Sequence, residues 1–424
     1  DGRFATVTPD AAPEPGDDRH AVAFPGLANV HSHAFQRGMA ALAETAGLND
    51  DDFWSWRETM YRFVLTLNPD QIEAIAAYAF AEMLEGGFTT VGEFHYLHHN
   101  PDGSPYANRA ELAERVAAAA GEAGIGLTLL PVFYAHGNFG DAPPSPRQAR
   151  FLNNLDGFST LLEGCRRAVS GLEGARVGVA PHSLRAASAA EVKAIAAMAP
   201  DGPIHIHAAE QTKEVEDCEA ATGLRPVEFL IERIGLDTRW CLIHATHLTA
   251  GETRKLAASG AVAGLCPVTE SNLGDGIFPT FDYLNGGGRF GVGTDSNILI
   301  SAADELKTIE YIQRLKYRAR NVLAPKGGST GRRLFDGALN GGAQALGLGG
   351  VGLAPGARAD LVTLQADHPS LALAQDDAAL DAWIFAGARI DRVWRAGREV
   401  VTGGVHKDRP ALEARYRKAL SPLA

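Results

Sequence analysis

Short apolar runs alternate with longer amphipathic stretches between residues 25 and 295 of the chain. The apolar runs are rich in β-branched residues and predict strands. They end at His33, His95, Tyr134, His182, His207, His244, Cys266 and Asp295. The stretches between them have helical spacing of apolar residues, as from Pro69 to the stop at Gly86. This repeated order predicts a closed parallel (β/α)8 barrel of the TIM type rather than an open doubly wound sheet.

Other parts of the chain have different patterns. The segment Phe53–Arg57 is polar and aromatic, and we predict a loop there. A single helix is predicted over residues 148–170, before the fourth strand. Residues 1–24 and 351–424 contain short β-type runs with turn residues between them. The two ends therefore predict β structure outside the barrel.

Charge and cysteine content exclude some classes of partner. The formal net charge is −12, so we expect neither nucleic acid nor an anionic membrane as a partner. No apolar run reaches the roughly 20 residues that span a bilayer, and no basic-then-apolar leader opens the chain. The four cysteines form no Cys-x-x-Cys pair, which predicts reduced thiols and a cytoplasmic location. The sequence starts at Asp1 in what reads as mid-strand, so we expect residues before it.

Polar side chains stand where several predicted strands end. His31 and His33 alternate along the first strand and so face one side, where two neutral imidazoles can bind a divalent metal. By itself, a His-x-His pair is more often a polar loop or two packed residues. The other strand ends carry His207 with Glu210 three residues later, His244 and Asp295. Because parallel barrels gather their chemistry at these ends, a metal site becomes the better interpretation.

The order His-x-His, His with Glu three residues on, His and Asp resembles the amidohydrolase superfamily, in the subset that uses one metal to deaminate C=N substrates. The resemblance implies that His31, His33, His207 and Asp295 bind the metal, with water in the open position. No lysine ends the fourth strand, where binuclear relatives carry one. We therefore expect a single ion, Zn²⁺ or alternatively Fe²⁺. His205 faces the same side as His207 and is a spare ligand, although a packed core residue is the simpler interpretation.

The same resemblance implies the domain organisation. Residues 25–350 would form the metal-dependent barrel. Residues 1–24 and 351–424 would come together as one small accessory β domain beside it. The segment Pro355–Val362 is similar to the usual signature of that domain in the superfamily.

Chemistry and resemblance together suggest the catalytic roles. Bound Zn²⁺ can lower the pKa of its water from about 15.7 to near 7, which makes a nucleophile at neutral pH. Ammonia is a poor leaving group until it is protonated, so a proton must travel to nitrogen. Glu210 is our general acid/base, and Asp295 can take the first proton from the water. His244 would hydrogen-bond the attacking hydroxide or the tetrahedral intermediate, or alternatively serve as a fifth ligand.

The loops resemble one family of deiminases more closely. The segments around Gln36, Phe53–Phe63, Glu93–His99, His207–Val215 and Leu265–Phe278 are similar to formiminoglutamate deiminases. This resemblance implies hydrolysis of N-formimino-L-glutamate to N-formyl-L-glutamate and ammonia, in histidine degradation. Its substrate is a small amidine dicarboxylate, and its members are expected to be homodimers.

Two carboxylates on the substrate call for cationic partners. Arginine binds a carboxylate through two parallel hydrogen bonds, and Arg57 and Arg185 are the candidates. Resemblance adds Gln36, Tyr96 and His182 as neutral hydrogen-bonding partners. Two alternatives stay open: a deaminase acting on a guanine, pterin or cytosine-like ring, and a barrel that has lost catalysis and serves binding or assembly.

Overall fold

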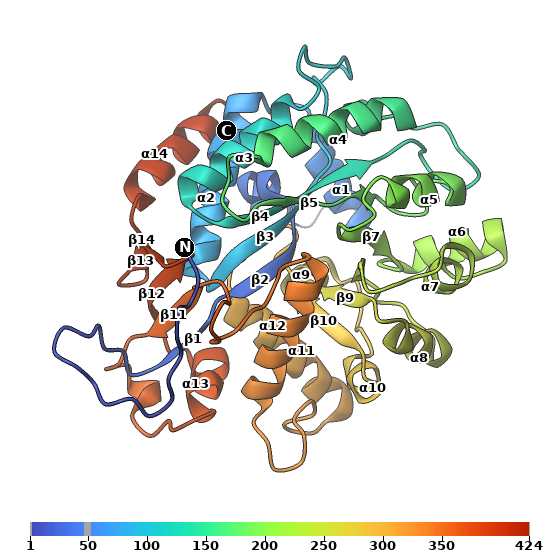
Figure 1. Cartoon of the computed structure of the whole chain (residues 1–424). Coiled ribbons are helices and arrows are strands. Elements are labelled where there is room, and N and C mark those ends of the chain that lie inside the picture. Colours follow the sequence, from blue (N-terminus) through green and yellow to red (C-terminus); the bar gives the residue numbers. More distant parts are fainter. Residues whose placement is uncertain (1, 46–51, 424) are drawn as a thin grey trace.

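The computed structural model describes residues 2–45 and 52–423 and confirms the predicted barrel (Figure 1). Its parallel strands are β2 (Leu27–Ser32), β3 (Phe88–His95), β4 (Gly126–Phe133), β5 (Arg176–Val177), β6 (Ala180–Pro181), β7 (Ile204–Ala208), β8 (Trp240–His244), β9 (Val262–Leu265) and β10 (Arg289–Val292). They are ordered β5-β4-β3-β2-β10-β9-β8-β7, and β6 also pairs with β4. Parallel bridges from Val179 to Ile204 and from Ser183 to His207 join the two ends of this order, so the sheet closes.

Helices cover the outside of the barrel (Figure 1). They are α2 (Pro69–Glu85), α3 (Glu111–Ala123), α4 (Leu155–Val169), α5 (Ala189–Ala197), α6 (Thr212–Thr222), α7 (Pro226–Phe229), α8 (Ala250–Ser259), α9 (Pro267–Leu273), α10 (Thr280–Asn285), α11 (Ala302–Tyr317) and α12 (Thr330–Ala345). Helix α2 shows why these stretches are helical. Asn68 and Gln71 exchange side-chain and backbone hydrogen bonds at its start, and Pro69 takes its first position. Its apolar residues Ile75 and Phe80 are fully buried.

The predicted loop at Phe53–Arg57 was wrong, because these residues begin helix α1 (Phe53–Val64). The Asp52 carboxylate accepts hydrogen bonds from the backbone N–H groups of Trp54 and Ser55, and the Ser55 hydroxyl accepts one from the Asp52 N–H. This capping box satisfies donors that a helix start leaves free. Arg57 therefore lies on a helix whose first turn is fixed.

Two further predictions needed correction. The single helix expected over residues 148–170 is a 3₁₀ helix (Pro146–Phe151) followed by α4, which begins after the Asn154 cap. The fourth strand is divided into β5 and β6 around Gly178. A Cβ atom at Gly178 would lie 2.4 Å from the carbonyl oxygen of Pro203, so only glycine permits this close approach to the neighbouring strand.

Both ends of the chain contribute to a second, antiparallel sheet. Its strands are β1 (Ala23–Pro25), β11 (Leu361–Leu364), β12 (Ile390–Arg395), β13 (Arg398–Thr402) and β14 (Val405–His406), in that order. Helices α13 (Ala378–Ala386) and α14 (Arg409–Leu420) were not predicted. Helix α14 packs on α2, where the rings of Tyr78 and Tyr416 stack with centroids 4.3 Å apart. None of the helices in the described ranges is long and apolar enough to cross a membrane.

Candidate metal centre and substrate pocket

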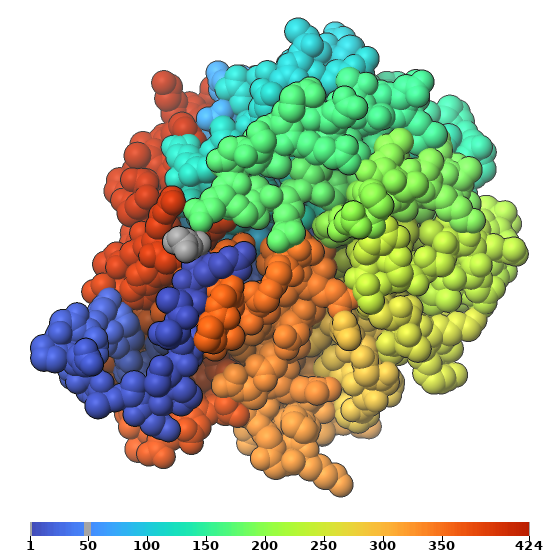
Figure 2. All heavy atoms as spheres, viewed as in Figure 1, coloured from blue at the N-terminus to red at the C-terminus, as the bar shows by residue number. Residues whose placement is uncertain are grey.

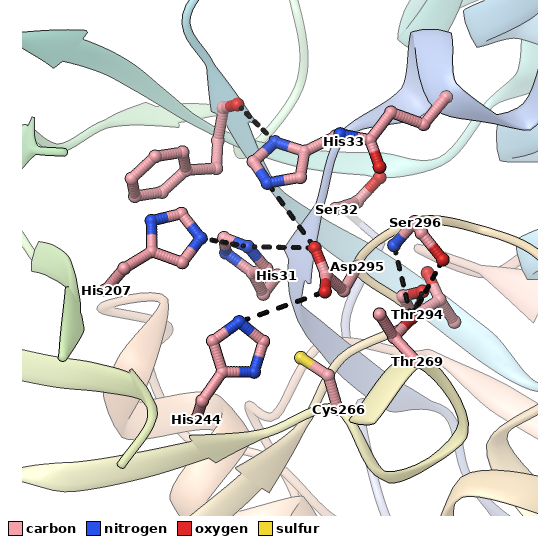
Figure 3. Close-up of polar contacts among 12 residues, drawn as sticks. His31, Ser32, His33, His207, His244, Cys266, Thr269, Thr294, Asp295 and Ser296 are labelled. Carbon is pink, nitrogen blue, oxygen red and sulfur yellow. Dashed lines mark hydrogen bonds and ion pairs between the residues drawn. The ribbon is translucent and has the colours of Figure 1, made fainter. Parts of the chain in front are cut away.

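Four predicted ligands converge at the carboxyl end of the barrel (Figure 3). His31 and His33 come from β2 and the residue after it, His207 lies near the end of β7, and Asp295 follows β10. The Asp295 Oδ1 atom lies 3.4 Å from Nε2 of His31 and 3.4 Å from Nε2 of His33. Nε2 of His207 lies 3.1 Å from Nε2 of His31. All four side chains are almost completely buried.

In two of the three histidines, the ring nitrogen that faces away from this centre has a carbonyl oxygen as hydrogen-bond partner. Nδ1 of His33 lies 3.0 Å from the carbonyl oxygen of Phe94, and Nδ1 of His207 lies 3.1 Å from that of His182. Each carbonyl accepts the Nδ1 proton and leaves the Nε2 lone pair directed inward. Burial, and repulsion between neighbouring imidazoles, lowers the pKa of His31 and His207 well below the usual value. The rings are therefore neutral, and the donor set of three imidazoles and one carboxylate fits a divalent metal such as Zn²⁺.

A buried hydrogen-bond network holds the turn that carries Asp295. The Asn29 amide donates to the Thr294 hydroxyl over 2.7 Å, and that hydroxyl donates to Asn297 over 2.6 Å. The Asn297 amide in turn donates to the carbonyl oxygen of His33 over 3.1 Å. Sequence analysis assigned no role to Asn29 or Asn297, because the contacts that join the two strand ends, Asn29 to Thr294 and Asn297 to His33, each span more than 250 residues of the chain.

Glu210 and His244 face each other beside the four predicted ligands. The His244 Nε2 and Glu210 Oε1 atoms are 3.7 Å apart. Burial raises the pKa of Glu210 to about 7, although the neighbouring His244 acts to lower it. Burial acts to lower the pKa of His244, but the carboxylates of Glu210 and Glu270 outweigh this effect and raise it to about 10. The pair can therefore share a proton near neutral pH.

Two further carboxylates, which sequence analysis did not assign, position this pair. Glu270 lies 3.2 Å from Nδ1 of His244 and also accepts a hydrogen bond from the Cys266 backbone. The Glu214 side chain accepts hydrogen bonds from the backbone N–H groups of Ala209 and Glu210 over 3.2 and 3.1 Å. The only sequence signal was the spacing of Glu214 four residues after Glu210, on the first turn of α6.

The predicted substrate-binding residues line one pocket together with this centre. Gln36, Arg57, Tyr96, His182 and Arg185 all line it, as do His33, His207, Glu210, His244 and Asp295. The pocket has a volume of about 70 Å³, which is several times the roughly 10–15 Å³ that one water needs.

Both arginines in the pocket have free hydrogen-bonding capacity. The Nε atoms of Arg57 and Arg185 are buried, and neither has a hydrogen-bond partner among the described residues. The guanidinium carbons lie 4.4 Å and 5.9 Å from the ring centroid of Trp54, which both can stack against. Burial acts to lower the pKa of Arg185, but neighbouring acidic groups, with Glu214 the strongest, together outweigh it and raise that pKa. The pocket is thus lined by two arginines, each with one buried donor that the described residues leave without a partner.

The neutral candidates have defined contacts as well. The Gln36 amide donates to the Tyr96 hydroxyl over 3.1 Å, and its carbonyl oxygen is buried without a partner among the described residues. His182 lies beside Tyr134, with ring centroids 4.7 Å apart. His205, the spare ligand, does not join the centre. Its Nε2 lies 2.7 Å from the carbonyl oxygen of Ala345, within the core.

Comparison with known proteins places the chain in a family. The sequence profile of the amidohydrolase family matches residues 22–400. A formimidoylglutamate deiminase of Pseudomonas aeruginosa is 49% identical over 96% of this chain and 90% of its own length. An 8-oxoguanine deaminase of the same organism is 31% identical over 96% of this chain and 88% of its own length. The crystal structure of an amidohydrolase from Brucella melitensis superposes with a TM-score of 0.97 and 54% identity, over 100% of this chain and 94% of that one. The chain belongs to the amidohydrolase family.

Proposed function

We propose that the protein hydrolyses N-formimino-L-glutamate to N-formyl-L-glutamate and ammonia, a step of histidine degradation. The observation that carries this proposal is the combination, in one pocket, of the His/Asp centre with two arginines whose Nε donors have no protein partner. Such arginines fit a substrate with two carboxylates. The relative named formimidoylglutamate deiminase supports the same substrate.

The metal would be held by His31, His33, His207 and Asp295, and we propose Zn²⁺, with Fe²⁺ as the alternative. When bound, such an ion supplies a water molecule that loses its proton near neutral pH. The protein contributes the orientation of the ligands. The carbonyl oxygens of Phe94 and His182 fix two of the imidazoles, and the Asn29–Thr294–Asn297 network fixes the loop of Asp295.

Glu210 and His244 would handle the protons. Glu210, with a pKa of about 7, can accept a proton released by the attacking water and deliver it to the substrate nitrogen. The new C–O bond forms as water adds to the formimino carbon. The remaining proton of the added hydroxyl group then passes to the same nitrogen, again through Glu210, as the C–N bond breaks and nitrogen leaves as ammonia. His244 lies 3.7 Å from Glu210 and would stabilise negative charge on the oxygen added to that carbon.

The glutamate part of the substrate would bind away from the metal. Arg57 and Arg185 would each bind one carboxylate, held in place by Trp54. Gln36, Tyr96 and His182 would hydrogen-bond the remaining polar atoms. The free carbonyl oxygen of Gln36 can accept from a substrate N–H group.

A second candidate is deamination of a nucleobase-like ring. It is favoured by the aromatic residues Phe53, Trp56, Tyr61 and Phe151 in the pocket wall, against which a flat ring could stack. The 8-oxoguanine deaminase among the relatives points the same way. The two arginines disfavour it, since a neutral ring would leave both without an anion.

The test is ammonia release by the zinc-loaded protein, with N-formimino-L-glutamate, guanine, 8-oxoguanine and cytosine assayed in parallel. We expect ammonia and an equal amount of N-formyl-L-glutamate from the first compound only. Release from a ring with none from N-formimino-L-glutamate would contradict the proposal and favour the second candidate.

We also propose that the protein acts as a cytoplasmic homodimer. The four cysteines are buried and unpaired in the structure, which suits a reducing compartment. The dimer rests on family resemblance alone. Light scattering coupled to size-exclusion chromatography should give twice the 44.9 kDa chain mass, and a monomeric mass would contradict this part.

A further inference from the structure

A second cavity lies at the opposite end of the barrel from the metal centre. It is lined by residues at the start of β2 and β3, by the end of α12, and by a loop at residues 348–352. Its volume is about 70 Å³, enough for a group the size of several waters. In Figure 2 the N-terminal segment in dark blue, the orange segment near residue 350 and the green segment near residue 174 meet on this face.

Three arginines from separate segments line this cavity: Arg3, Arg176 and Arg358. Arg3 and Arg358 stand directly opposite each other in an antiparallel bridge, an arrangement of like charges that destabilises a sheet unless something compensates it. Asp360 is the one carboxylate among the lining residues, and it pairs with Arg358 over 2.5 Å. Within the described residues Arg176 has no ion pair. The cavity wall therefore carries an excess of positive charge, although the whole chain is acidic.

Gly174 lies beside two guanidinium groups. A Cβ atom there would lie 3.7 Å from Nη2 of Arg395 and 3.9 Å from Nη1 of Arg358. The Nε atom of Arg395 is buried and has no partner within residues 2–45 and 52–423. Burial and the charge of Arg358 lower the pKa of Arg395. Arg395, whose Nη2 donates to the carbonyl oxygen of Glu173, adds a further positive charge near the cavity that Asp360 and Glu173 offset only in part.

The loop after α12 adds backbone donors to the same wall. Its sequence is Gly349-Gly-Val-Gly352, and across the described part of the chain none of these four amides donates to a protein acceptor. Gly352 has a φ of +97°, which a residue with a side chain rarely adopts. Consecutive free amides in a glycine loop, next to arginine, are how proteins bind the oxygens of phosphate and carboxylate groups.

We propose that this cavity binds a small dianion of the phosphate or dicarboxylate class, between the barrel and the second sheet. Arg3, Arg176 and Arg358 would supply charge, and the amides of residues 349–352 would supply further hydrogen bonds. The ligand would relieve the repulsion between Arg3 and Arg358. It would also hold together the N-terminal segment, the loop after α12 and the start of β5, so binding should stabilise the fold. This site is separate from the metal centre and does not depend on the proposed reaction.

The test measures thermal unfolding and calorimetric binding of the metal-loaded protein with inorganic phosphate and, separately, with succinate. Ionic strength is kept constant with sodium chloride. Arg176→Ala and Arg3→Ala are compared with Arg254→Ala, which removes an exposed arginine of α8. We expect a saturable rise in the unfolding midpoint of the wild type and Arg254→Ala with at least one of the two anions. The anion that binds tells whether the site takes phosphate or carboxylate.

In Arg176→Ala and Arg3→Ala we expect binding at least tenfold weaker, since each removes a charge-assisted hydrogen bond to the anion. Arg176→Lys should recover part of the affinity, because it restores the charge. No saturable effect of either anion on the wild type would overturn the proposal. So would equal binding in Arg176→Ala and Arg254→Ala. Succinate could instead bind only to the arginines of the substrate pocket. Its affinity would then be the same in the wild type and Arg176→Ala, which would also overturn the proposal.

Discussion

After three of the barrel strands, at their carboxyl ends, residues with side chains occupy left-handed backbone positions, whereas glycines occupy them at two turns of the opposite end. Ala209, His244 and Asp295 have φ values of 53°, 67° and 46°. At the turns that lead from helices into β4 and β10, Gly124 and Gly287 have φ values of 77° and 82°. Glycine adopts a positive φ without steric cost, whereas a residue with a Cβ atom does not.

Chemistry explains this difference between the two ends. Asp295, a proposed metal ligand, and His244, proposed to stabilise charge on the reacting oxygen, must have side chains, so these two positions keep strained backbones that the surrounding hydrogen bonds hold in place. The opposite end needs only tight turns. The second cavity at that end is lined by three arginines, which stay protonated at every relevant pH, and by one carboxylate. The carboxyl end combines Arg57 and Arg185 with buried imidazoles and carboxylates that titrate. The predictions below test this division, starting with the largest effect.

Replacing a proposed ligand should abolish the function of the carboxyl end. We expect His207→Ala to lose bound metal and all measurable ammonia release, because one of four donors is removed from a buried centre. His205→Asn is the matched control, since it lies two residues earlier on the same face of β7 but contacts Ala345 instead. Metal analysis of both purified variants checks this. A fully loaded His207→Ala protein would exclude His207 from the ligand set.

Replacing the proton carrier should separate metal binding from turnover. Glu210→Gln should keep wild-type metal content while kcat falls by about 10²–10⁴-fold, the usual contribution of general acid–base catalysis. The exposed Glu216→Gln on α6 serves as control. Steady-state kinetics together with metal analysis measure the effect. If Glu210→Gln turned over at the wild-type rate, Glu210 would have no part in the mechanism.

Removing a pocket arginine should affect the dicarboxylate substrate most. For Arg185→Met we expect kcat/KM for N-formimino-L-glutamate to fall about 10- to 100-fold, because a charge-assisted hydrogen bond contributes about 1.5–3 kcal/mol. Arg254→Met, on the surface of α8, is the control. The idea fails if Arg185→Met keeps the wild-type kcat/KM for this substrate.

The sequence predicted those parts of the molecule that depend on local pattern. Alternation along β2 placed His31 and His33 on one face, and strand ends located His207 and Asp295. The start of α1 was predicted as a loop from its polar and aromatic composition, and the helix cap formed by Asp52 was not recognised. The positions of Glu270 and Asn297 were also not recognised. Glu270 contacts His244 and Asn297 contacts His33, which belong to other strand ends, and nothing in the local pattern shows which strand ends will meet.

Buried histidine at the carboxyl end should make the fold sensitive to acid. Burial lowers the pKa of His95 from 6.5 to about 3. Between these values the unfolded chain binds more protons than the folded one. Stability is therefore complete above pH 6.5 and falls as the pH drops towards 3, with a slope of up to about 1.4 kcal/mol per pH unit from this group.

His95→Gln should remove that part of the slope. Urea unfolding of wild type and variant at pH 7.0, 6.0 and 5.0 measures it, and the difference in unfolding free energy between them should shift in favour of the variant as the pH falls. A difference that stays constant with pH would show that His95 does not titrate on unfolding.

The smallest expected effect tests the difference in backbone conformation itself. Alanine is replaced by glycine at one end of the barrel, and glycine by alanine at the other. Ala41, exposed in the segment after β2, has a φ of 67°. Gly287, before β10, has a φ of 82° and no atom within 4 Å of an added Cβ. With little packing at either position, only backbone conformation should matter. We expect Ala41→Gly to raise, and Gly287→Ala to lower, the free energy of unfolding, each by about 0.5–1 kcal/mol. Urea unfolding of both variants decides the matter, since shifts of the same sign would mean that φ does not control stability at these turns.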